Sequence, residues 1–181
     1  ISSANGTAAA AGGGAWEVIS SQTVSSGVSS VSIGGITGYD NYKILISGLE
    51  MANNSGEFRM RFSTDNGATE QSAGNHSYAY QYGEGGGTFG SVKFATADRV
   101  WLGSDFTSGG SYEISLSNLG SSSVYSSGYV NSSTYQVTGH TRFFTGAFHQ
   151  RIAQTVNGVL FHVNTNNINA GTFTLYGIKN S

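Results

Sequence analysis

Short stretches in which apolar and polar residues alternate run along most of the chain. The clearest is residues 57–63, "EFRMRFS", where Phe58, Met60 and Phe62 alternate with two arginines and other polar residues. Successive side chains of a β-strand point to opposite faces of its sheet, so this pattern predicts a strand with one apolar and one charged face.

Similar stretches recur about every 8–12 residues between clusters of Gly, Ser and Asn, a spacing typical of sandwiches and barrels. No window shows the helical pattern of apolar residues. An Asn-Gly pair at residues 66–67 predicts a β-hairpin turn. Further strands are predicted at residues 16–24, 28–33, 41–49, 75–82, 92–95, 99–103, 111–118, 134–148, 156–163 and 171–179. Nine to eleven antiparallel strands favour a jelly-roll-like β-sandwich.

Composition agrees with an all-β fold. The chain has 27 glycines, ten tyrosines, ten phenylalanines and no proline. Gly permits tight turns, and aromatic residues suit a half-buried pleated surface. A length of 181 residues fits one domain, with enough core to need no disulfide, and the chain has no cysteine. We predict a single sandwich domain over residues 16–181, preceded at 1–15 by a flexible Ala/Gly connector or the end of an upstream region.

The small net charge and the scattered basic residues limit the kinds of molecule that the chain is expected to bind. The formal net charge is −2, and the eight Lys and Arg residues are scattered rather than gathered into a basic stripe. No apolar run approaches the roughly 20 residues that span a bilayer. We therefore expect neither nucleic-acid binding nor membrane insertion.

Motifs for catalysis or metal binding are weak. The four histidines lack metal-ligand spacing, and there is no thiol nucleophile. The glycine-rich segment at residues 85–90 precedes a strand pattern rather than a helix, so it predicts a loop and not a dinucleotide site. We expect no enzyme activity, metal or cofactor. A glycan hydrolase remains an alternative because it needs only two carboxyl groups that the fold brings together, and Glu84, Asp98 and Asp105 are the acids considered.

The segment "HSYAYQY" at residues 76–82 raises a choice between core and ligand platform. Tyr78, Tyr80 and Tyr82 alternate with small or polar residues, so the tyrosine face is expected to be the covered one. We favour the core or a subunit interface for these rings, and a sugar platform is the second hypothesis.

The two tryptophans pose the same choice. Trp16 is expected to be an aromatic plug that anchors the first strand, whereas for Trp101, in "DRVWLGSDF", a core and a binding role are about equally favoured.

Three segments resemble a known family: "AAAAGGGAWEVISSQTV", "YDNYKILISGL" and "NNINAGTFTLYGIKNS". They are similar to the C-terminal β-domain of bacteriophage tail fibres and tail structural proteins. In that family a Trp follows a Gly-rich connector, a Tyr-rich strand follows "YD", and the chain ends in a strand of the form Gly-x-hydrophobic-x-Leu-Tyr-Gly-hydrophobic. The matching positions are Trp16, Tyr39, Asp40, Tyr42 and residues 171–178.

The resemblance implies a virion protein on the outside of the particle, commonly a homotrimer, that contacts other virion subunits and a host surface receptor. Aromatic rings stack on the faces of sugars, so we expect the receptor to be a glycan. The candidate ligand contacts are Tyr78, Tyr80, Tyr82, Trp101, Tyr125, Tyr129 and Tyr135, together with the glycine loop 83–90. The alternative is a capsid decoration or fibre-assembly domain that binds no glycan.

Overall fold

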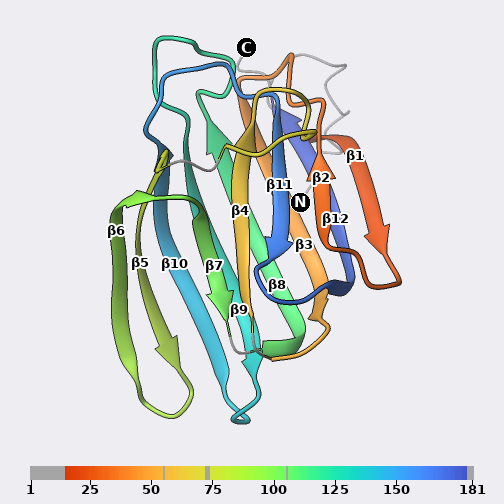
Figure 1. Cartoon of the computed structure of the whole chain (residues 1–181), viewed down its shortest axis with the longest axis vertical. Coiled ribbons are helices and arrows are strands. Elements are labelled where there is room, and N and C mark those ends of the chain that lie inside the picture. The colour runs from red at the N-terminus through yellow and green to blue at the C-terminus, as the bar shows by residue number, and fades with distance from the viewer. Residues whose placement is uncertain (1–14, 55, 72–73, 105, 179–181) are drawn as a thin grey trace, which may run out of the picture.

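A computed structural model of the chain describes residues 15–54, 56–71, 74–104 and 106–178. These residues form twelve β-strands and no helix, arranged as two packed antiparallel sheets (Figure 1). The predicted all-β sandwich is confirmed. The predicted connector, apart from Ala15, and Asp105 lie outside the described residues.

The large sheet has eight strands. In spatial order they are β1 (Glu17–Val24), β12 (Ile168–Ile178), β3 (Asn41–Met51), β8 (Phe106–Ser117), β9 (Ser127–Gln136), β10 (Thr141–Gln150), β5 (His76–Glu84) and β6 (Phe89–Ala97). The small sheet has four strands, in the order β2 (Ser30–Ile33), β11 (Gly158–Val163), β4 (Glu57–Ser63) and β7 (Val100–Ser104). The small sheet lies in front of the large one in Figure 1, and β5 and β6 project beyond it on the left.

Two hairpins widen the large sheet. The chain inserts β5–β6 between β4 and β7, and β9–β10 between β8 and β11. The four strands lie side by side as β9-β10-β5-β6, and we call them the extension. The remaining eight strands form two quartets, β1-β12-β3-β8 and β2-β11-β4-β7. The extension is therefore an addition to an eight-stranded sandwich.

Two sequence predictions need correction. The single strand predicted at residues 134–148 is two strands, β9 and β10, because Gly139 adopts a positive φ of 84° in the turn between them. Asn66 and Gly67 do form a turn with positive φ, but the predicted hairpin is wrong because β4 and β5 belong to different sheets. The side chain of Asp65 accepts a hydrogen bond from the backbone N–H of Thr69 (2.8 Å), which fixes this crossing turn.

Aromatic side chains from both sheets meet in the centre of the core. Phe58 on β4 stacks on Phe161 of β11, with ring centroids 5.7 Å apart, and lies 5.2 Å from Tyr112 on β8. Phe161 in turn lies 5.4 Å from Phe173 on β12. All four rings are buried, as the alternation in residues 57–63 predicts for Phe58. We call these four residues the aromatic cluster, and they join the two sheets.

Phe62 organises a second part of the core. Its ring stacks on His76 with centroids 5.7 Å apart and lies 6.1 Å from Phe148. His76 is fully buried, and desolvation lowers its pKa to about 4. The imidazole is therefore neutral at pH 7 and packs as an aromatic ring.

Replacement of Phe58 by alanine should lower the free energy of unfolding by about 3–5 kcal/mol, because it leaves a cavity between the sheets. Phe94→Ala is the matched control, since that ring is 50% exposed, and it should cost less than about 1 kcal/mol. Urea unfolding followed by tryptophan fluorescence measures both. Equal losses for the two variants would contradict a central role for the aromatic cluster.

Stability should fall on acidification because of His76. Its pKa is about 4 in the folded chain and about 6.5 when unfolded, so the unfolded state binds more protons between these values. The free energy of unfolding should therefore drop by about 3 kcal/mol from pH 6.5 to pH 4 through this group. Urea titrations of the wild type and of His76→Phe, across this range, measure the difference. An identical pH slope in the two proteins would refute the assignment.

Candidate functional site

The outer face of the large sheet, which points away from the small sheet, carries a continuous row of mostly polar side chains. Residues directly opposite each other on neighbouring strands share a face, so the strand registers define the row. Across the eight strands it comprises Ser21, Thr174, Leu45, Glu113, Asn131, Thr145, Gln81 and Ser91. Leu45 is its one apolar member. We call it the polar row.

Hydrogen bonds and an ion pair fix the orientation of side chains in the middle of this face. Thr145 donates to Oδ1 of Asn131 at 2.8 Å, so the hydroxyl of Tyr129, 2.5 Å from Thr145 Oγ1, donates to Thr145. Lys43 forms a 2.7 Å ion pair with Glu113 on the neighbouring strand. These contacts orient side chains that would otherwise rotate freely on the surface.

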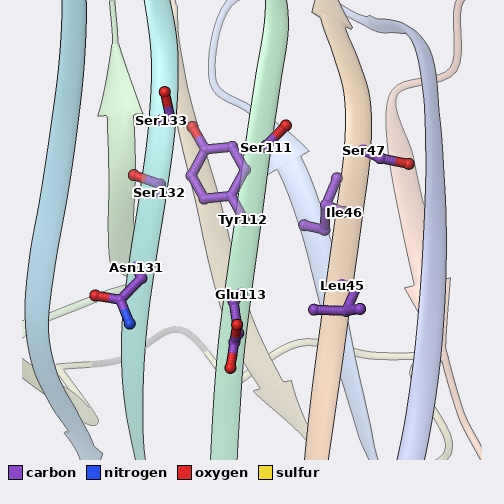
Figure 2. A pocket seen from close by; sticks show the side chains of 9 residues that line it. All are labelled: Leu45, Ile46, Ser47, Ser111, Tyr112, Glu113, Asn131, Ser132 and Ser133. Atoms are coloured by element: carbon purple, nitrogen blue, oxygen red, sulfur yellow. The ribbon is translucent and has the colours of Figure 1, made fainter.

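A shallow hollow of about 400 Å³ lies over β3, β8 and β9. Figure 2 shows Glu113 and Asn131 on neighbouring strands, below Ser111 and Ser133. Short hydroxyl side chains leave this part of the sheet low and supply both donors and acceptors.

A second hollow, of about 490 Å³, lies on the extension. One cross-strand row within it runs from Tyr129 through Ala147 and Ala79 to Lys93. The two alanines form a low floor between the longer side chains at its ends. Thr145, Gln81 and Ser91 of the polar row line the same hollow, which we call the extension hollow.

A third hollow, of about 500 Å³, adjoins it and shares Gln81 and Ser91. Phe89, which is 77% exposed, and Phe143 lie on either side of Gly83 in the cross-strand register. A Cβ atom at Gly83 would come within 2.9 Å of Cε1 of Phe89 and closer still to the ring of Phe143. Glycine is therefore what allows both rings to lie over this strand.

The structure separates the predicted tyrosines of "HSYAYQY". Tyr78 and Tyr80 are only 5% and 3% exposed, and their rings stack 5.1 Å apart on the inner side of the large sheet. Burial raises the pKa of Tyr78 to about 12. The prediction that these two tyrosines contact a ligand therefore needs correction. Their side chains lie on the inner face of the large sheet and are covered by the core.

Tyr82 and Trp101 lie together, but away from the outer face. They line a hollow of about 240 Å³ with Phe144 and Arg142 on the inner side of the extension. Trp101 meets Phe144 edge to face at 5.0 Å, and the guanidinium of Arg142 lies 5.8 Å from the ring of Tyr82. Both predicted residues are half-buried.

The remaining predicted tyrosines are exposed. Tyr129 and Tyr135 lie on the outer face of β9, about 20 Å apart along the strand. Tyr125 lies in the segment before β9 rather than on the sheet. The glycine loop 83–90 forms the end of the β5–β6 hairpin and contains the exposed Phe89. Of the predicted residues, Tyr129 and Tyr80 line the extension hollow, and Tyr129 is the one whose side chain is exposed.

Trp16 is not the buried plug that its sequence position predicts. It is exposed, with the Nζ of Lys43 5.1 Å from its ring centroid, so it belongs to the outer face. The prediction fails because the first strand is an edge strand, with a sheet neighbour on one side only.

Sequence reasoning missed Gln81, Lys93, Phe143 and Thr145. A signal for one of them was present, because Ser77, Ala79 and Gln81 alternate with the tyrosines of β5. Their small size excluded them from the core, and that same property makes them the floor of an open surface. The other three depend on strand pairing, which the sequence does not show.

Two of the three acids considered for hydrolysis, Glu84 and Asp98, are paired with arginines. Glu84 forms an ion pair with Arg142. Asp98 forms ion pairs with Arg61 (2.8 Å) and with Arg99. Partial burial opposes ionisation of Asp98, but hydrogen bonds and charge from these two arginines lower its pKa overall. A general acid needs a raised pKa, so Asp98 is poorly suited to that role.

Within the described ranges, no three His, Cys, Asp or Glu side chains gather as a metal site. The same residues include no helix able to span a bilayer.

A comparison with models of known protein families and with curated protein sequences finds no match to this chain.

Proposed function

We propose that this chain is the distal domain of a bacteriophage tail fibre and that it binds a host surface glycan through the outer face of the large sheet. The sequence resemblance supports the virion role. The observation that carries the binding role is the polar row beside exposed aromatic rings on the extension.

This chemistry suits a polyhydroxylated ligand. Hydroxyl and amide side chains both donate and accept hydrogen bonds, as sugar hydroxyls do. The exposed rings of Tyr129 and Phe143 offer apolar surfaces to the C–H faces of sugar rings. Eight strands span about 34 Å at the usual strand spacing, so the face accommodates an extended glycan chain rather than one sugar.

The topology supports a division between scaffold and binding surface. We propose that the two quartets form a jelly roll, to which the extension adds a recognition surface. Of the exposed aromatic residues, Phe89, Phe94, Tyr129, Tyr135 and Phe143 lie on the extension.

A second candidate function is a capsid decoration or fibre-assembly domain. Phe94 favours it, because this exposed ring lies on the inner side of the edge strand β6, opposite Tyr78 in the register. An edge strand with an exposed apolar ring can dock against another subunit. The homotrimer implied by the sequence resemblance would offer such a contact.

Glycan binding should depend on the aromatic residues of the outer face. On an array of bacterial surface polysaccharides, Tyr129→Ala and Phe143→Ala should each weaken wild-type binding by about 1 kcal/mol or more, roughly fivefold. Phe94→Ala is the matched control, since it removes an exposed ring from the other side of the extension. Binding lost equally in all three variants, or absent from the wild type, would contradict the proposed surface.

Particle labelling tests the location. Fab fragments raised against this domain and bound to parent virus particles should appear by electron microscopy at the distal ends of tail appendages. Label spread over the capsid would instead support the decoration role.

A further inference from the structure

The charged side chains around the extension hollow indicate which class of glycan it would bind. Among the described residues that point outward from β9, β10, β5 and β6, Lys93 is the only Lys, Arg, Asp or Glu. His149 is the other basic side chain on this surface. Arg142 and Glu84 pair with each other, and Arg142 lies over the rings of Tyr82 and Phe144 on the inner side.

The other lysine on the outer face differs from Lys93. Lys43 is neutralised by Glu113 at 2.7 Å and lies over the ring of Trp16. Lys93 is exposed at the rim of the extension hollow and its nearest cross-strand neighbour on this face is Ala79. The hollow therefore presents one uncompensated positive charge to a ligand.

The geometry of the hollow fits a ligand placed between Lys93 and Tyr129. These residues end a row across four strands, so about 14 Å separates their backbones. Ala147 and Ala79 keep the intervening floor low, and Thr145 and Gln81 place hydrogen-bonding groups along one side. The Tyr129 hydroxyl is already bonded to Thr145, which fixes the ring at the opposite end.

We propose that the extension hollow is a subsite for an acidic sugar residue, whose carboxylate pairs with Lys93 while Gln81 and Thr145 contact its hydroxyl groups. This inference rests on the proposed glycan-binding function. A neutral polysaccharide would leave the Lys93 ammonium without a partner, whereas a uronate supplies a charge-assisted hydrogen bond.

Two probes that differ only in charge test the subsite. One is a tetrasaccharide that contains glucuronic acid, and the other is the same tetrasaccharide after reduction of its carboxyl groups to alcohols. In calorimetric titrations of the full chain at low ionic strength, the acidic probe should bind about three- to tenfold more tightly, as expected for one partly screened charge-assisted contact. Added salt should reduce that preference.

Lys93→Gln should abolish the preference, so that the acidic and the reduced probes bind this variant with equal affinity. Lys43→Gln is the matched control, because it removes a lysine from the same face but outside the hollow, and it should keep the preference. A preference that survives in Lys93→Gln, or is lost in Lys43→Gln, would overturn the assignment to Lys93.

The outcomes separate the two proposals. Equal wild-type affinity for both probes would overturn the acidic subsite while leaving glycan binding intact. No binding of either probe, together with a blank polysaccharide array, would overturn both. Binding to virion subunits with no saccharide affinity would do the same and favour the assembly role.

Discussion

Packing of aromatic rings between the sheets is the contact on which the rest of the molecule depends. Phe58 and Phe161 of the small sheet meet Tyr112 and Phe173 of the large sheet. These rings contribute large apolar areas, and burial of such area is the main driving force of folding in a chain with no disulfide. Because they come from four strands, two in each sheet, they fix how the two quartets stack. Once that stack exists, the outer face of the large sheet needs no apolar residues.

Because neither outer face has to supply the core, the two faces can differ in the polar side chains that they carry. The small sheet carries most of the ion pairs of the described residues, including those of Arg61 and Arg99 with Asp98. The large sheet carries hydroxyl and amide groups with few charges. Paired charges bind water strongly and are costly to desolvate, whereas neutral polar groups exchange water for a ligand at lower cost. The large sheet is accordingly the better surface for binding a polar ligand.

The sequence predicts the strands well where alternation is strong, and less well where a turn lacks a distinct signal. The strand at residues 57–63 is confirmed with its bounds, since Phe58 and its alternate neighbours can be buried on one face only. The turn at residues 137–140 has one glycine in an otherwise strand-like context, so the pattern predicts one strand where the structure has two.

The candidate site was harder to predict, because it depends on which strands pair. In β5 the sequence shows two faces, tyrosines on one and small polar residues on the other. It indicates that the tyrosines are covered, but not that the remaining face opens into a hollow. Lys93 and Tyr129 are 36 residues apart, and only the order β9-β10-β5-β6 brings them to opposite ends of one row. Long-range pairing of this kind leaves no local pattern in the chain.

The insertion of both hairpins into connections of the sandwich has an evolutionary consequence. Outward positions on the extension, such as Gln81 and Lys93, contact neither Phe58 nor its partners in the aromatic cluster. Substitutions there are close to neutral for folding, as is usual for surface positions. A lineage can therefore diversify this surface, one strand position at a time, and change the chemical groups that it presents while inheriting an unchanged scaffold.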